Sequence, residues 1–122
     1  MKEYLRYISD FMQVVRRTGS VEYGLRSSKR YAGSARLIIA SNGLDRDEAK
    51  ALEEALGGTR TVLLRLNEVT PAELGRAAGR GHPVKALAVL SLGDADLDRF
   101  LESMREFEGS GALSVVRPSR RR

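Results

Sequence analysis

TGSVEYGLRSSKRYAGSARLIIASNG, the stretch from residue 18 to residue 43, indicates the fold class of this chain. Residues 20–23 alternate polar and apolar side chains, as a half-buried strand does. Residues 37–40 read LIIA, an apolar run typical of a strand that is covered on both faces. Between them, Gly24 ends the first strand and opens a short helix that we expect over residues 25–31. A strand, a helix and a buried strand with almost no spacer predict the α/β class.

The rest of the chain continues the same alternation. Apolar residues recur at spacings of three and four over residues 3–17, which predicts an amphipathic helix. Asp45 with Glu48, and Thr70 with Glu73, have the spacing of capping boxes and mark two further helix starts. The remaining expected elements are helices over residues 45–56, 71–79 and 94–107, the last capped by Asp94, and strands over residues 61–66 and 86–92. Mostly apolar strands alternating with helices predict a three-layer α/β/α sandwich.

The length and composition indicate one small domain with little catalytic equipment. The chain has 122 residues, no Cys and one His, so disulfides, thiolate metal sites and mechanisms that need two histidines are excluded. No apolar run approaches the roughly 20 residues of a membrane span, and the start MKEYLRYISDF is not expected to be a signal peptide. We expect one domain over residues 1–108, a hinge at 109–111, a loosely held basic tail over 109–122 and a cytoplasmic location.

The charge is distributed unevenly along the chain, whose formal net charge is +5. Residues 1–41 carry 8 basic and 3 acidic side chains, whereas residues 94–116 carry 2 basic and 6 acidic ones. The last six residues, RPSRRR, add four positive charges. Of the 21 basic residues 17 are Arg, whose planar fork suits phosphate oxygens and guanine edges, although a genome rich in Arg codons explains the ratio equally well.

No motif indicates an enzyme, a cofactor or a metal. A nucleophile elbow, a P-loop and a zinc-protease helix motif are all missing from the sequence. Residues 79–81, GRG, lack the third glycine and the preceding strand of a dinucleotide fingerprint. Asp94, Asp96 and Asp98 are better explained by a helix start, where acids favour the macrodipole, than by a calcium loop. The single histidine, His82, lies in a Gly-rich segment, where a lone histidine is more typical of an ordinary loop residue than of a catalytic base.

Two loops carry residues suited to nucleic acid. Gly24 is followed by hydroxyl and basic side chains, including Ser27, Lys29 and Arg30, on the first turns of the expected helix, where a phosphate backbone could be held. An ordinary solvated helix start is the alternative. Asn42 follows the buried strand and has an amide that can donate and accept at a base edge; the alternative is a plain Asn-Gly turn.

About 100 residues of the chain resemble a known family. The segments RRTGSVEYGLRSSKRYAGSARLIIASNG and AELGRAAGRGHPVKALAVLSLGDADL look like the archaeal and eukaryotic large-subunit ribosomal protein family L-thirty-e, of the L-seven-A-e kink-turn RNA-binding superfamily. The residues that carry the resemblance are Thr18-Gly19, Gly24, Ala40-Ser41-Asn42, Glu73-Leu74-Gly75 and Gly93-Asp94. Asn42 favours L-thirty-e, because the L-seven-A-e branch usually has an acid there, whereas residues 74–79 look more like the L-seven-A-e version.

The resemblance implies an α/β/α sandwich with a four-stranded mixed sheet, in which three neighbouring loops grip a sharply bent RNA. Gly24, Leu25 and Arg26 match a Gly-aromatic-Lys segment that contacts RNA. Asn42 matches a base-reading Asn, Arg46 an Arg early in the next helix, and His82 a Phe that packs against RNA in eukaryotic members. Leu25 and His82 thus depart from the aromatic residues of the family, and the tail from Gly109 has no counterpart.

On this hypothesis the chain is a non-catalytic ribosomal protein of the large subunit that binds a kinked rRNA element. Arg26, Lys29 and Arg30 would contact phosphates, and Gly24 and Gly43 would let the backbone approach the RNA. Its partners would be rRNA and neighbouring ribosomal proteins, with no membrane, and the free protein would be monomeric. The alternatives are a kink-turn-binding core protein of a guide-RNA modification particle, and a protein-interaction module with incidental basic charge.

Overall fold

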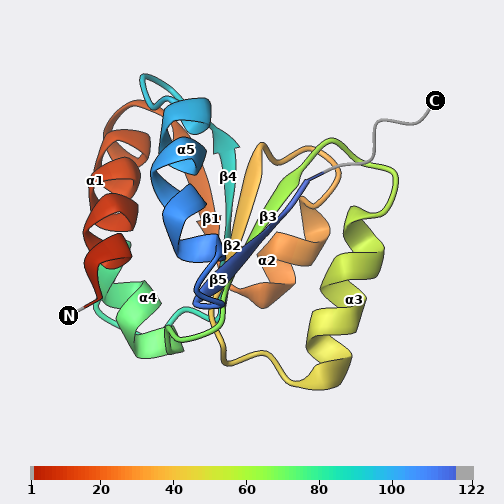
Figure 1. The fold of residues 1–122 in the computed structure, drawn as a ribbon. Coiled ribbons are helices and arrows are strands. Elements are labelled where there is room, and N and C mark those ends of the chain that lie inside the picture. The colour runs from red at the N-terminus through yellow and green to blue at the C-terminus, as the bar shows by residue number, and fades with distance from the viewer. Residues whose placement is uncertain (1, 118–122) are drawn as a thin grey trace.

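The computed structural model describes residues 2–117, which form a mixed α/β fold with five helices and five strands (Figure 1). In chain order the elements are α1 (Glu3–Thr18), β1 (Ser20–Tyr23), α2 (Leu25–Arg30), β2 (Leu37–Ala40), α3 (Arg46–Leu56), β3 (Val62–Leu66), α4 (Pro71–Ala77), β4 (Ala86–Ser91), α5 (Leu97–Glu108) and β5 (Leu113–Val116). None of the helices in this described part of the chain is long and apolar enough to cross a membrane.

The five strands form one mixed sheet in the order β1-β4-β2-β3-β5. Strand β4 is antiparallel to both β1 and β2, β2 is parallel to β3, and β5 is antiparallel to β3. The carboxyl ends of β1, β2 and β3 therefore lie at the same end of the sheet as the beginning of β4. This end faces the lower part of Figure 1 and carries the loops in which the sequence analysis placed the candidate RNA contacts.

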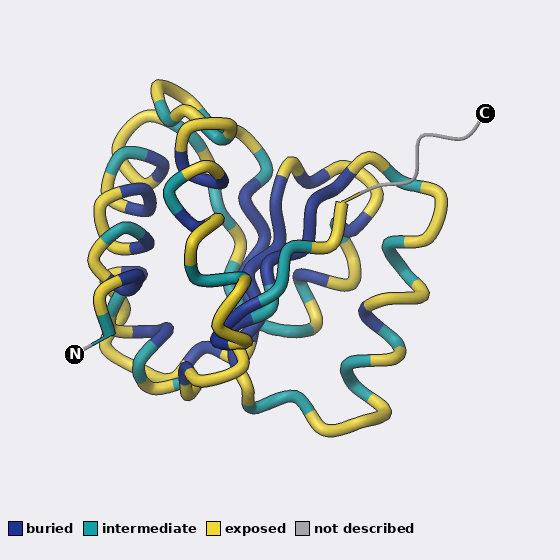
Figure 2. Tube along the Cα trace, in the orientation of Figure 1, coloured by how far each residue is buried: buried dark blue, intermediate teal, exposed yellow. Residues whose placement is uncertain are grey.

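Helices lie against both faces of the sheet, with α1, α4 and α5 on one side and α2 and α3 on the other (Figure 1). Figure 2 shows the buried residues gathered along the strands and on the sheet-facing sides of the helices. The apolar positions predicted for α1, Leu5, Ile8, Met12 and Val15, are all buried. Phe11 of α1 stacks on Phe100 of α5, with 4.2 Å between the ring centroids, and this contact joins the two helices over the larger core.

The prediction of a four-stranded sheet is wrong, because β5 adds a fifth strand. Residues 113–116 belong to the segment expected to be a loose tail, but they pair with β3 in the register Leu66↔Leu113 to Leu63↔Val116. Leu113 is 1% exposed and packs in the larger core, so burial of its side chain holds the strand in place. The arginines at 120–122, at the end of the predicted basic tail, lie outside the described residues.

Both predicted capping boxes are confirmed, whereas the predicted cap of the last helix is wrong. The side chains of Asp45 and Thr70 accept hydrogen bonds from the backbone N–H groups of Glu48 and Glu73. Asp96, not Asp94, caps α5, and its carboxylate accepts from Arg99 N at 3.1 Å. Asp94 is instead held by the end of α1, because its N–H donates to Thr18 Oγ1 at 2.8 Å. Helix α5 therefore begins later than predicted.

Candidate nucleic-acid interface

Three loops meet at one end of the sheet, and hydrogen bonds join them directly. The N–H of Gly24, which follows β1, donates to the carbonyl oxygen of Ala86 at 2.7 Å. The N–H of Ser41, which follows β2, donates to the carbonyl oxygen of Lys85 at 2.8 Å. The β1–α2, β2–α3 and α4–β4 loops are thus adjacent, as expected for strands that end where β4 begins (Figure 1). We call this end of the sheet the loop interface.

The β1–α2 loop depends on an unusual backbone conformation at Gly24. Its φ of 105° and ψ of 154° lie in a region that residues with a Cβ rarely adopt. A Cβ built at Gly24 would meet no atom within 4 Å, so conformation rather than crowding requires the glycine. The carbonyl oxygen of Gly24 accepts from the N–H and hydroxyl of Ser28, at 3.0 and 2.8 Å. Ser28 is fully buried and fixes the start of α2.

Helix α2 brings the predicted cations to the surface beside this loop. Arg26, Lys29 and Arg30 are exposed, and Ser27 and Leu25 are partly buried. Within residues 2–117, Arg26, Lys29 and Arg30 form no ion pair. Because α2 has only six residues, its dipole is small, and any affinity for phosphate must come mainly from these side chains.

The β2–α3 loop holds the backbone of Asn42 firmly and leaves its side chain exposed. Ser41 is 6% exposed, and its hydroxyl donates to Lys85 O at 2.9 Å and accepts from Gly43 N at 3.1 Å. The N–H of Asn42 itself donates to Val69 O at 2.8 Å. The carboxamide of Asn42 makes no hydrogen bond within residues 2–117 and so remains free to donate and accept.

Packing against a neighbouring segment requires a glycine at position 43, and the sequence did not predict this. A Cβ built at Gly43 would collide with the ring of Pro71, reaching its Cδ at 3.0 Å and its Cγ closer still. The close approach that requires this glycine is therefore to the start of α4. The expected approach of RNA to Gly43 stays a prediction.

Lys85 was missed by the sequence analysis and links the loop interface to α3. Its ammonium lies 3.1 Å from Oε2 of Glu48. Glu48 also accepts from the N–H of Asp45 at 3.0 Å, and this hydrogen bond, followed by that from Lys85, lowers the pKa of the Glu48 carboxyl below its usual range. Arg46, one residue beyond the cap of α3, is exposed and forms no ion pair in the described part of the chain.

The α4–β4 loop brings His82 beside the segment at Gly24. A shallow hollow of about 250 Å³ is lined by both residues, with Leu25 and Lys85 also in its wall. His82 is exposed, and its Nδ1 lies 3.1 Å from the carbonyl oxygen of Pro83. Leu25 and His82 therefore line the same hollow.

Two further arginines near this loop were not predicted as site residues. Arg80 stacks over the ring of Tyr23, with 4.4 Å between its guanidinium carbon and the ring centroid. Arg76 lies one turn earlier, in the last turn of α4. The segment GRG at residues 79–81 contains Arg80 and could have indicated a basic loop, but the sequence analysis compared it only with a dinucleotide fingerprint.

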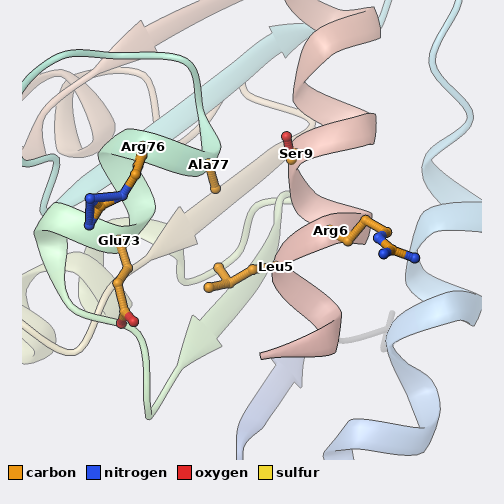
Figure 3. A pocket seen from close by; sticks show the side chains of 6 residues that line it. All are labelled: Leu5, Arg6, Ser9, Glu73, Arg76 and Ala77. Atoms are coloured by element: carbon orange, nitrogen blue, oxygen red, sulfur yellow. The ribbon is translucent and has the colours of Figure 1, made fainter. Parts of the chain in front are cut away.

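A hollow of about 480 Å³ lies away from the loop interface, between α1 and α4 (Figure 3). Leu5 and Ala77 point into it, whereas the guanidinium groups of Arg6 and Arg76 point away from each other. Its polar groups therefore do not converge on one point as a ligand site requires. Within residues 2–117 no three His, Asp or Glu side chains are grouped so as to hold a metal ion.

Comparison with known proteins gives no family. No protein-family model matches this chain, and no curated protein is significantly similar to it.

Proposed function

We propose that this chain is a non-catalytic structural component of the large ribosomal subunit, in the cytoplasm, and that it binds a kinked element of the ribosomal RNA. Arg26, Lys29 and Arg30 contact phosphates, and Asn42 hydrogen-bonds the edge of a base exposed in the bend. Bent and unpaired RNA is a suitable target because the deep major groove of a regular A-form helix is too narrow for side chains to read.

The observation that carries this proposal is the junction of the three loops. Gly24 donates a backbone hydrogen bond to Ala86, the first residue of β4, and Ser41 donates one to Lys85 just before it, so the three loops are joined directly. The exposed carboxamide of Asn42 projects from a backbone that the Ser41–Lys85 hydrogen bonds hold in place. The exposed cations lie on α2. A fixed polar group, with cations on a nearby helix that form no ion pair within residues 2–117, is the combination that base recognition on a charged backbone requires.

The same proposal includes the three-layer α/β/α description of the fold. Helices on both faces of the sheet and two cores support it, because the smaller core lies under α2 and α3 and the larger one under the other three helices (Figure 1). This layering leaves only the ends of the strands free to carry loops. An RNA that binds at one end therefore meets loops and not a sheet face.

A binding titration tests the proposal. The protein is titrated with a kink-turn RNA and with a straight duplex of equal length, at two salt concentrations, alongside Asn42→Ala. The expected result is a preference for the kink-turn that survives high salt and falls by about 1–3 kcal/mol in the variant. Gln13→Ala, which removes an exposed amide from α1, is the matched control and keeps the preference.

Equal binding of both RNAs, with joint release as salt rises, would show that the charge is generic and would favour the protein-interaction alternative. Once the preference is established, sedimentation of tagged protein with large ribosomal subunits distinguishes the remaining candidates. Recovery with small guide RNAs instead of the subunit would overturn the ribosomal assignment and favour the guide-RNA particle.

A further inference from the structure

A second hollow lies beside the end of α4 and adjoins the loop interface. Its volume is about 220 Å³, and its lining residues are Ala72, Arg76, Arg80, Gly81, His82 and Pro83. It shares His82 and Pro83 with the hollow that Gly24 and Leu25 line. The interface thus continues along the surface toward α4.

The lining of this hollow is positively charged and contains no carboxylate. Arg76 and Arg80 are exposed and form no ion pair in the described part of the chain. The acid of α4, Glu73, is engaged elsewhere, because it accepts from Thr70 N at 2.9 Å and from Lys2 Nζ at 3.4 Å. Two uncompensated guanidinium groups around a concave surface favour an anion.

Arg80 is held in a position that leaves its hydrogen-bond donors free. Its backbone N–H donates to Gly75 O at 2.7 Å, and its guanidinium lies over the ring of Tyr23. Stacking uses the flat face of a guanidinium and leaves the N–H groups at its edge available for two oxygens of a phosphate. Because the ring already orders the side chain, less conformational entropy is lost when the anion binds.

Gly81 lines the hollow and leaves open space beside its main chain. A Cβ built at this residue would meet no atom within 4 Å, so its space faces solvent rather than the protein. A nucleic-acid backbone can therefore approach the main chain at Gly81 without displacing any part of the structure.

We infer that this hollow binds a phosphate group of the RNA backbone, with Arg80 as a bidentate donor and Arg76 as the second cation. The inference rests on the proposed RNA-binding function and adds a second contact to it, on α4, separate from the cations of α2. The chemistry recognised is that of a phosphate, which a free phosphate ion also offers, so the test must separate these two sources.

The test combines arginine substitutions in the protein with removal of the charge of single phosphates in the RNA. Kink-turn RNAs that each carry one uncharged methylphosphonate are titrated with wild-type protein and with the Arg76→Ala/Arg80→Ala double variant. At one position the substitution weakens wild-type binding about tenfold and has almost no further effect on the double variant. Because both arginines contact one phosphate, the double variant also loses about one unit of the slope of log K against log salt.

A charge-matched control removes two arginines at the opposite end of the sheet. Arg60 precedes β3, and Arg99 lies in the first turn of α5; both are exposed and form no ion pair within residues 2–117. Arg60→Ala/Arg99→Ala is expected to show no coupling to any single methylphosphonate. Arg80→Lys, which keeps the charge and loses the fork, should recover only part of the coupling.

Failure of the inference and failure of the proposed function give different results. If the kink-turn preference depends on Asn42 but no position couples to Arg76 and Arg80, the inference is overturned and the function stands. If coupling occurs without a kink-turn preference, the phosphate site stands and the function is overturned. Titration with inorganic phosphate completes the test: saturation at micromolar concentration that requires both arginines, with no coupled RNA position, would assign the hollow to a free ion.

Discussion

The hydroxyl of Ser41 donates a 2.9 Å hydrogen bond to the carbonyl oxygen of Lys85, and this bond ties the end of β2 to the beginning of β4. The two residues are 44 positions apart in the chain, and the backbone N–H of Ser41 donates to the same oxygen at 2.8 Å. Both groups belong to a buried residue whose neighbour is the exposed Asn42. The link therefore fixes the backbone from which the proposed base-reading amide projects.

Replacing Ser41 by alanine should lower both stability and RNA discrimination. Ser41→Ala removes one acceptor for Gly43 N and one donor to Lys85 O, and a buried group left without its partner costs about 1–3 kcal/mol. The measurement is the free energy of unfolding in urea, followed by RNA titration at a temperature where the variant is fully folded. The kink-turn preference should fall, because Asn42 loses its fixed position, while binding to a straight duplex is unchanged.

Ser34→Ala provides the control for that substitution. Ser34 is exposed, and its hydroxyl donates over a longer distance, 3.4 Å, to Tyr31 O. Its removal should change the free energy of unfolding by less than about 0.5 kcal/mol. Equal losses in the two variants would show that the Ser41 hydrogen bonds have no special role.

Replacing Gly24 by alanine should destabilise the fold through backbone strain alone. The φ of 105° is unfavourable for any residue with a Cβ, while the added methyl group would touch nothing. The expected loss is about 1–3 kcal/mol in the free energy of unfolding. Gly81→Ala is the matched control, because it also has open space but no positive φ, and its change should stay below about 1 kcal/mol.

A substitution in β5 tests whether the fifth strand belongs to the folded core. Leu113→Ala should cost about 2–5 kcal/mol, because the side chain is 1% exposed and its loss leaves a cavity. Val116→Ala, in the same strand but at a position that is 46% exposed, should cost less than about 1 kcal/mol. Unfolding in urea measures both, and similar small losses would mean that the segment after α5 is loosely held, as the sequence first indicated.

The sequence predicted the elements whose signals are local. The capping pairs Asp45–Glu48 and Thr70–Glu73 and the apolar run of β2 each depend on residues close in the chain, and all three are present in the structure. The junction of the β1–α2, β2–α3 and α4–β4 loops was expected only from the resemblance. The strand order places these loops together, and hydrogen bonds such as that from Ser41 to Lys85 join them.

What the sequence did not reveal depends on contacts between distant segments. β5 has four residues after a Gly-Ser-Gly turn, and only pairing with β3 and burial of Leu113 make it a strand. The reason for Gly43 is the ring of Pro71, 28 positions away. The order of the Arg80 side chain likewise depends on Tyr23, which belongs to a different element. No local spacing encodes such pairs.

The two capping boxes make the free energy of unfolding depend on pH in the acidic range. A hydrogen bond from the N–H of Thr70 to Glu73, followed by the charge of Lys2, lowers the pKa of the Glu73 carboxyl, and Glu48 is lowered in the same way by Asp45 N and Lys85. A carboxyl whose pKa is lower in the folded than in the unfolded chain contributes stability above its ordinary value of 4.5. This contribution is lost as the pH falls from 4.5 through the lowered pKa. The free energy of unfolding should therefore decrease over that interval.

Glu73→Gln isolates one of these two groups. Glutamine can still accept from Thr70 N, so the helix start is kept while the negative charge, and with it the pairing to Lys2, is removed. Urea unfolding from pH 7 to pH 3 should show the variant less stable than wild type at neutral pH, with the difference shrinking as Glu73 becomes protonated. Glu106→Gln, which removes an exposed acid from α5, changes the net charge equally and is the control for the overall charge. A difference for Glu73→Gln that stays constant from pH 7 to pH 3 would show that its charge does not stabilise the start of α4.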